Sequence, residues 1–215
     1  MNSNQKFTAV EKAFYSDGYL LGMKVVESDL SQNVLFTSIS EMYSAIDELI
    51  NSISTLAQKH NQSIHCKKGC EYCCHQPVFA LEYEMQYLNS FIKERFSETR
   101  QKEIREKANE NRLKLIDLDK TQILNSKQPC PLLENGTCSA YEARPMACRI
   151  YLSTDVNSCI TFYDKPKNKS SFPALLDFPM RAGRIMNEGF KAALKTKVLI
   201  MQEFRIDEVI KLPTH

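Results

Sequence analysis

The segment Cys66-Lys67-Lys68-Gly69-Cys70-Glu71-Tyr72-Cys73-Cys74 places four cysteines within nine positions. The other cysteines of the chain, Cys130, Cys138, Cys148 and Cys159, follow within thirty positions of one another. Clusters of this kind are typical of a metal site in an intracellular protein. The alternative is eight buried, unreactive thiols, since free cysteine packs like a small hydrophobic residue. Because core cysteines have no reason to cluster, the sequence predicts a metal centre.

The first group of cysteines admits two local structures. Cys66, Cys70 and Cys73 lie at positions i, i+4 and i+7, so on a helix they would share one face. Gly69 instead permits a tight loop, in which Cys70 and Cys73 form a CxxC knuckle that grips one ion. In both cases the adjacent thiols of Cys73 and Cys74 point in different directions. They would serve two different metals, or a metal and the edge of a neighbouring cluster.

Sulfur is the predicted ligand, and the expected metal ligands are Cys66, Cys70, Cys73, Cys74, Cys130, Cys138, Cys148 and Cys159. Eight thiolates would supply two Cys₄ zinc sites, two iron–sulfur clusters, or one four-ligand centre with four cysteines left over. The spacing suits both Zn²⁺ and an iron–sulfur cluster. Vicinal cysteines and surplus thiols suit a redox or reactive centre, and they favour an iron–sulfur cluster of the [4Fe–4S] type.

Several cations stand beside the cysteines in the sequence. Four thiolates on one zinc ion carry a net charge of −2, which favours basic neighbours. Arg144 and Arg149, close to Cys148, are the predicted charge-balancing residues around the metal, and Lys67 and Lys68 are further candidates. The flanking histidines, His65 and His75, are expected in surface or packing roles because the chain already offers enough sulfur ligands.

Composition and apolar periodicity predict a mainly α fold. Glycine is scarce, at 6 of 215 residues, and aromatic residues make up 9%. Apolar residues recur at helical spacing in five stretches, which begin near Val10, Met42, Leu81, Ile104 and Phe178. A capping box of Ser38 and Glu41 is expected to start the second helix, and Asp177 the last one. On the last stretch, Gly189 suggests the close approach of another backbone.

The second cysteine group lies on less regular structure. Cys130 and Cys138 flank Asn135-Gly136, the pair preferred in a type I′ turn, so a tight hairpin or knuckle is expected. Pro145 suits the first turn of a short helix that carries Cys148 and Arg149. The predicted fold class is therefore mainly α, an irregular helical bundle with a cysteine-rich metal-binding segment that contains a short hairpin or knuckle.

The length and net charge of the chain limit its domain organisation and the kinds of partner it could bind. We expect a single domain over 1–215, with N-terminal helices in 1–60, a cysteine-cluster metal-binding region in 66–160 and a C-terminal helical region in 172–215. A net charge of +2 argues against a nucleic-acid partner. No apolar run suits a secretion signal or a membrane span, so a cytoplasmic protein without a membrane partner is expected.

The cysteine pattern resembles that of a known family. Cys66–Cys74, Cys130-Pro131-Leu132-Leu133, Gly136–Tyr141, Arg144–Arg149 and Cys159 together are similar to the CxxCxxCC family of zinc- or iron-chelating proteins, also called YkgJ-type cysteine-cluster proteins. All eight cysteines fall on family positions. One departure is the spacing of three residues between Cys66 and Cys70, where the family name implies two. The resemblance implies metal binding, and flagellin lysine-N-methylase looks like a distant relative with an iron–sulfur centre.

Three functions follow from these observations. The first is a metal-binding protein whose cysteine cluster chelates an iron–sulfur cluster or zinc. The second is an iron–sulfur-dependent enzyme of the lysine N-methylase kind, which would take a protein substrate. The third is a structural zinc module whose helices bind a protein partner. No GxSxG, GxGxxG or phosphate-loop pattern marks a catalytic site, so the sequence leaves the question of enzymatic activity open.

Overall fold

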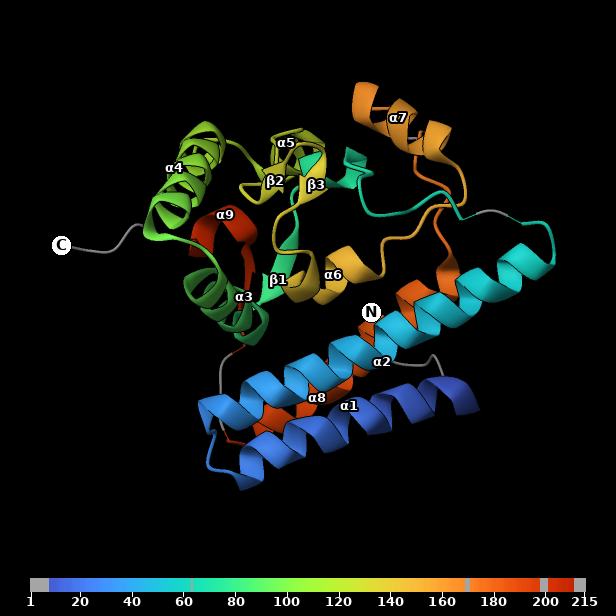
Figure 1. Cartoon of the computed structure of the whole chain (residues 1–215), viewed down its shortest axis with the longest axis vertical. Helices are drawn as coiled ribbons and strands as arrows, with labels where there is room; N and C mark the ends of the chain where they lie inside the picture. The colour runs from blue at the N-terminus through green and yellow to red at the C-terminus, as the bar shows by residue number, and fades with distance from the viewer. Residues whose placement is uncertain (1–7, 63, 169–170, 198–200, 211–215) are drawn as a thin grey trace.

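The computed structural model describes residues 8–62, 64–168, 171–197 and 201–210. The fold is mainly α, as predicted (Figure 1). Its long helices are α1 (Ala9–Glu27), α2 (Gln32–Lys59), α3 (Glu82–Arg95), α4 (Glu98–Leu115) and α8 (Asp177–Leu194). Its short helices are α5 (Lys120–Asn125), α6 (Met146–Arg149), α7 (Val156–Asp164) and α9 (Ile206–Val209), with 3₁₀ turns η1 (Tyr72–His75), η2 (Tyr141–Ala143) and η3 (Lys195–Lys197).

Two small antiparallel ladders complete the described fold. β2 (Leu133–Glu134) pairs with β3 (Thr137–Cys138), and the turn between them has positive φ at Asn135 (48°) and Gly136 (73°). Positive φ at both central residues is the type I′ geometry, so the predicted hairpin is confirmed. β1 (Phe79–Leu81) pairs with β4 (Glu203–Arg205), a contact that the sequence did not reveal because three-residue strands carry almost no periodic signal.

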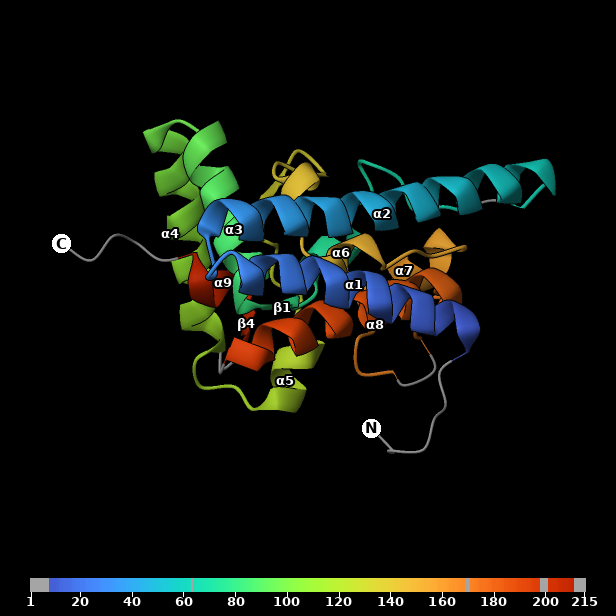
Figure 2. The ribbon, with the colours of Figure 1, turned by 90° about the horizontal axis from the view of Figure 1, so that it is seen from below.

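Helices α1, α2 and α8 lie side by side and form a bundle (Figure 2). Their shared core includes Val25, Ile39, Met42, Ile46 and Phe190. A Cβ atom on Gly18 would overlap the carbonyl oxygen of Met186, and one on Gly189 would overlap that of Tyr15. The close approach expected at Gly189 is therefore confirmed, and the glycines of α1 mark the α1–α8 interface.

A second core lies away from this bundle. It is built from α3, α4, α9 and the segment around the hairpin, and its fully buried residues include Met85, Leu88, Ile104, Ala108 and Leu132. The predicted apolar faces of α3 and α4 supply most of this packing. Cys138 of the hairpin and Cys148 of α6 pack against this core.

Buried polar side chains join the two cores. Glu84 of α3 accepts hydrogen bonds from Tyr43 Oη of α2 (2.9 Å) and from the backbone N of Met146 (2.7 Å) at the start of α6. Asn187 Nδ2 of α8 donates to the same carboxylate at 3.3 Å. Because a buried carboxylate needs such donors, Glu84 fixes α6 against both the bundle and α3.

Two helix predictions need correction. Helix α2 begins at Gln32 rather than near Ser38, which is buried inside the helix, because Val34, Leu35 and Phe36 also pack against the bundle core. In α8 the buried face passes through Met186 and Phe190 rather than through Phe178, which is 47% exposed. The helix N-cap is Leu176, one residue before the predicted Asp177.

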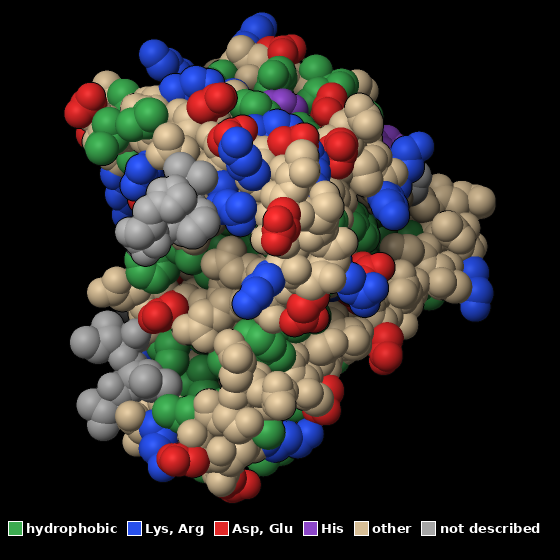
Figure 3. All heavy atoms as spheres, turned by 60° about the vertical axis from the view of Figure 1, so that its left-hand side comes forward, with side chains coloured by type: hydrophobic (Ala, Val, Ile, Leu, Met, Phe, Trp, Pro, Cys, Tyr) green, Lys and Arg blue, Asp and Glu red, His purple; other side chains and the backbone are tan. Residues whose placement is uncertain are grey.

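The surface carries charges of both signs. On the face shown in Figure 3, basic and acidic side chains are interspersed, without a large area of one sign. This agrees with the near balance of 28 basic and 26 acidic residues. Among the helices of the described residues, none is long and apolar enough to cross a membrane.

Candidate metal centre

One cavity of about 340 Å³ brings the two cysteine groups together. It lies between α2, η1, the hairpin and α6. The thiol-bearing residues that line it are Cys66, Cys70, Cys73, Cys74, Cys130, Cys138 and Cys148. Cys159, the remaining cysteine, is buried on α7 and does not line the cavity. All eight cysteines are free thiols.

Backbone hydrogen bonds hold the cysteine segments against one another. The backbone N of Cys130 donates to the carbonyl of Cys74 at 2.7 Å, which joins the start of the hairpin to η1. The Cys66 sulfur accepts from the backbone N of Ser153 at 3.0 Å, and its thiol donates to the carbonyl of Tyr151 at 3.6 Å. Segments more than fifty residues apart in the sequence are thus neighbours at the cavity.

The local structure of the first group resolves the choice between helix and loop. Gly69 has a φ of 95°, and the chain turns there before Cys70, whose backbone N donates to the carbonyl of Lys67 at 3.0 Å. Only Cys73 and Cys74 lie in the short 3₁₀ helix η1. The loop arrangement that Gly69 permits is therefore the observed one, and the shared helix face was the wrong alternative.

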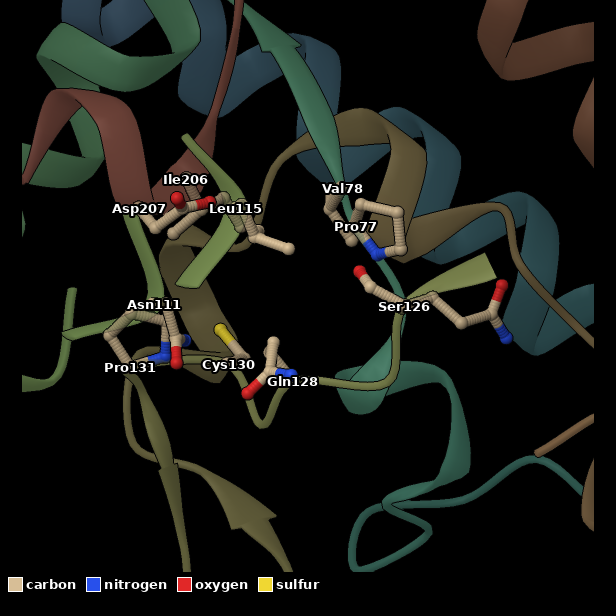
Figure 4. A pocket seen from close by; sticks show the side chains of 11 residues that line it. Pro77, Val78, Asn111, Leu115, Ser126, Gln128, Cys130, Pro131, Ile206 and Asp207 are labelled. Carbon is tan, nitrogen blue, oxygen red and sulfur yellow. The ribbon is translucent and has the colours of Figure 1, made fainter. Parts of the chain in front are cut away.

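A small pocket adjoins the cavity on the side of α4 and α9 (Figure 4). Its volume is about 30 Å³, room for about one water molecule, and Cys130 lines both spaces. Asn111 of α4 lines the pocket and donates through Nδ2 to the carbonyl of Pro129 at 2.7 Å. This bond fixes the segment that delivers Cys130 to the cavity.

The thiols surround the cavity rather than converging on one point. Among the described residues, no three His, Cys, Asp or Glu side chains are grouped so as to hold a metal ion as they stand. A single tetrahedral zinc ion needs four sulfurs about 2.3 Å from the metal. As the side chains stand, no such set of sulfurs is gathered among the described residues.

Burial keeps these thiols in their neutral form when no cation is present. It raises the pKa of Cys66 to about 11 and that of Cys130 to about 12. A hydrogen bond with Cys74, followed by burial, raises the pKa of Cys73. A cation in the cavity would favour the thiolate, so binding of a metal there would release protons. Sulfur donors in a buried cavity fit a thiolate-bound metal or cluster.

Arg144 is one of three basic residues that line the cavity, together with Lys67 and Arg149. It lines the cavity, its guanidinium lies 3.7 Å from the centre of the Tyr141 ring, and its Nη2 lies 3.5 Å from Asp47 Oδ1. Its Nε is buried and has no hydrogen-bond partner among the described residues. An unpaired buried N–H is costly, so this atom favours an anionic group in the cavity, such as a centre bound by thiolates.

Arg149 has a different environment from Arg144. Its side chain is 2% exposed, and it pairs with Asp47 of α2 and donates to the carbonyls of Glu142 and Arg144. Its guanidinium also lies 4.1 Å from the centre of the Tyr43 ring. With all of these partners, Arg149 fixes α6, and therefore Cys148, against α2.

The remaining candidates lie at the rim. Lys67 lines the cavity, whereas the Nζ of Lys68 lies 5.9 Å from the centre of the Tyr141 ring. His65 accepts through Nδ1 from the backbone N of Val156 at 3.0 Å, and His75 contacts the Tyr163 ring at 5.0 Å. Neither histidine is among the residues that line the cavity.

Sequence reasoning missed the part of the wall that α2 supplies. Ile50, Asn51 and Ser54 line the cavity, and Asp47 pairs with both Arg144 and Arg149. These residues precede the first cysteine and follow the ordinary periodicity of a helix. Nothing in the sequence marks them, because their role depends on how α2 packs against α6.

Comparison with known proteins supports metal binding. A family model named CxxCxxCC, described as a putative zinc- or iron-chelating domain, matches residues 65–174. That span is about half of the chain and includes every cysteine. No curated protein and no solved structure matches the chain. The similarity to flagellin lysine-N-methylase therefore stays a prediction.

Proposed function

We propose that this chain, which belongs to the CxxCxxCC family of zinc- or iron-chelating domains, binds an iron–sulfur cluster in its cysteine-lined cavity. The family supports metal binding in general, and the choice of metal is our inference. One observation carries it. Seven thiols line a single cavity of about 340 Å³, which is more sulfur and more space than one four-coordinate ion uses.

This geometry favours a cluster over a single zinc ion. Zinc–sulfur bonds of about 2.3 Å in a tetrahedron put the four sulfurs only about 3.8 Å apart. In an iron–sulfur cluster the thiolates attach to different irons, so the same number of sulfurs spreads over a wider space. Soft thiolate ligands suit both, and the size of the cavity supports the larger group.

The residues around the cavity would have separate roles toward the cluster. The cysteines would supply thiolate ligands, and Arg144 would offset their negative charge through its unpaired Nε. Arg149 would act through position, because it holds α6 against α2. When bound, the cluster would supply one-electron redox chemistry.

Binding would also order the region around the cluster. The elements that carry the thiols are a loop, η1, a hairpin of two-residue strands and the four-residue helix α6. Such short elements bury little apolar surface of their own, so a shared metal centre would stabilise them. We therefore propose that 66–160 folds as one metal-dependent region of the single domain 1–215, between the helices of 1–60 and those of 172–215.

Purification without oxygen tests the proposed cluster. We expect iron and acid-labile sulfide in equal amounts, with broad visible absorbance near about 400 nm that decreases on reduction. Cys73→Ser should lower the iron content and the absorbance, because Cys73 is one of the thiols that line the cavity. Lys68→Ala, which alters the same loop without removing a sulfur, is the matched control and should leave both unchanged. A colourless protein loaded with zinc would overturn the proposal.

The clustering of the cysteines supports a cytoplasmic location. Clustered cysteines that bind a metal need a reducing compartment, whereas secreted proteins oxidise clustered cysteines to disulfides. Cell fractionation tests this, because the protein should follow a cytoplasmic marker enzyme. Recovery with the membrane or with the secreted fraction would contradict it.

A further inference from the structure

We propose that the cysteine-lined cavity also binds an organic carboxylate, a small anion with an apolar part, at the side that α2 borders. The residues that would hold it, here called the α2 rim, are Asn51, Lys67, Tyr141 and Arg144. Binding there rests on the proposed function in one respect, because the ligand would share the cavity with the metal centre. The α2 rim itself consists of residues that supply no sulfur.

The charged residues that line the cavity are all basic. They are Lys67, Arg144 and Arg149, and the described part of the chain contributes no Asp or Glu to the lining. Asp47, which lies outside the lining, is the carboxylate that pairs with both arginines. An anion gains from such a lining, whereas a cation would be repelled. The cavity therefore favours an anionic ligand over a neutral or cationic one.

Arg144 offers the hydrogen-bond donors that a carboxylate needs. Its side chain is 12% exposed, and its Nε is buried without a partner among the described residues. Its Nη2 contacts Asp47 Oδ1 at 3.5 Å, which is longer than a strong hydrogen bond. A guanidinium has five N–H donors in a fork that matches a carboxylate. One such fork can serve a thiolate-bound centre and a carboxylate beside it.

The wall that α2 contributes is continuous with Arg144. Four residues at spacings i, i+3, i+4 and i+7 share one face of this helix: Asp47, Ile50, Asn51 and Ser54. The last three line the cavity, and the first contacts Arg144. Arg144 therefore meets α2 within one turn of the part of the helix that borders the cavity. Because α2 contains no cysteine, this wall is available to a ligand other than the metal.

The α2 rim is accessible from solvent. Asn51 and Lys67 are exposed, and Tyr141 is 36% exposed. The ring centre of Tyr141 lies 3.7 Å from the guanidinium of Arg144 and 5.9 Å from Nζ of Lys68. These contacts bring the loop of the first cysteines, η2 and Arg144 together at the edge of the cavity. A small molecule can therefore reach Arg144 from solvent.

The size and lining of the cavity indicate an organic ligand rather than a simple inorganic anion. Its volume of about 340 Å³ falls within the range of about 300–1,000 Å³ that is usual for small-molecule sites. Ile50 and Pro145, the sequence neighbours of Asn51 and Arg144, also line it. Such sites combine apolar walls with a few polar groups that fix the orientation of the ligand. An apolar group on the carboxylate would contact these two side chains.

Calorimetric titration of the metal-loaded protein with benzoate and benzamide tests the site, because these probes have nearly the same shape and differ in charge. We expect benzoate to bind at least about tenfold more tightly than benzamide, and more tightly than acetate, which lacks the ring. Arg144→Gln should weaken benzoate binding about tenfold or more, and Lys67→Met about threefold. Arg184→Met, at an exposed position of α8, is the control and should not change it. Equal affinity for benzoate and benzamide, or no binding of benzoate up to about 10 mM, would overturn the proposal.

Two further variants and probes keep the test independent of folding. Arg144→Lys retains the charge but loses the fork, so its affinity for benzoate should lie between those of Arg144→Gln and the unaltered protein. If neither Arg144→Lys nor Lys67→Met changed this affinity, the α2 rim would not be the site. Inorganic phosphate is the competing probe, and tighter binding of phosphate than of benzoate would overturn the assignment to an organic carboxylate.

Metal analysis of the same samples separates the anion site from the proposed cluster. A zinc-loaded protein that binds benzoate in the expected pattern would reject the iron–sulfur cluster but support the anion site. An iron–sulfur protein that does not distinguish benzoate from benzamide would reject the anion site and support the cluster.

Discussion

Helices α1 and α8 contact each other along much of their length, whereas the cysteine-rich region consists of short elements joined by loops (Figure 2). The bundle of α1, α2 and α8 buries a continuous apolar core and needs no ligand to do so. The cysteine-rich region surrounds a cavity of about 340 Å³ with thiols. One chain therefore combines a region stabilised by apolar burial with a region that, in our proposal, a bound metal centre stabilises.

Removal of the metal should give the largest effect, a loss of structure in the cysteine-rich region that the bundle does not share. Structural zinc contributes about 10–16 kcal/mol to the folding of zinc-finger peptides, and a metal centre here would act in the same way. After chelation, we expect amide hydrogen exchange to become fast in Cys66–Cys74, the hairpin and α6. Peptides from α1 and α8 should keep their protection, because their core contains no cysteine. Equal loss of protection in the bundle would show that the two regions are not independent.

A substitution at Gly18 should damage the bundle instead. Gly→Ala inside a helix normally stabilises it by about 0.5–1 kcal/mol. At Gly18 the added Cβ would overlap the carbonyl of Met186, so we expect Gly18→Ala to lower the free energy of unfolding by about 3 kcal/mol. Urea denaturation measures the change. Ser16→Ala on the exposed side of α1 is the matched control and should be almost neutral.

The metal content of the Gly18→Ala protein tests whether the cavity depends on the packing of the bundle. Below the denaturation midpoint, the metal bound per folded chain should stay at the level of the unaltered protein, since α1 does not line the cavity. An early loss of metal would show that the cavity depends on the packing of α1. Unchanged stability would contradict the close α1–α8 contact.

Loss of Arg149 should weaken the link between the two regions. Arg149→Met would leave the carbonyls of Glu142 and Arg144 without their donor and Asp47 without its buried partner. We expect the free energy of unfolding to fall by about 2–4 kcal/mol, together with weaker metal retention against a chelator. Arg184→Met, at an exposed position of α8, is the control. If both variants behaved alike, the Arg149 network would not connect α6 to α2.

The smallest effect is expected at the start of α1. The hydrogen bond from the backbone N of Thr8 (2.7 Å) lowers the pKa of Glu11 below its usual value of 4.5, with a further contribution from Arg181. A lowered pKa in the folded state stabilises the protein above the unfolded pKa, and this is lost as the pH falls through the folded value. Glu11→Gln should therefore lower the melting temperature slightly at pH 7. Melting curves should coincide at a pH well below 4.5, and a difference that persisted there would contradict this origin.

Local sequence signals predicted most of the helices and the hairpin. Apolar periodicity found α1, α3, α4 and α8 because each buries one face, and Asn135-Gly136 found the turn because few other pairs adopt positive φ twice. The start of α2 was missed, because Ser38 matches a capping box but lies in a continuous helix. The pairing of β1 with β4 was also missed, since it joins segments more than a hundred residues apart.

The candidate site, like the fold, could be predicted from the sequence only in part. Clustering and spacing singled out the cysteines, and the number of cations near Cys148 singled out Arg144 and Arg149. The separate environments of these two arginines could not be predicted, because both depend on Asp47, which lies about a hundred residues earlier in the chain. Nor does spacing predict that Cys159 is buried on α7 outside the cavity.

The sequence by itself determined the chemistry: a set of soft sulfur donors, a mainly helical chain to carry them, and the turn between Cys130 and Cys138. These properties are local, since residue type sets ligand preference and short-range periodicity sets helix formation. Only the tertiary structure decided that the two cysteine groups border one cavity, that α2 forms part of its wall, and that Arg149, which lines the cavity with Arg144, is the more deeply buried of the two. Such juxtapositions depend on how distant elements pack, and packing is governed by the shapes of whole surfaces rather than by spacing along the chain.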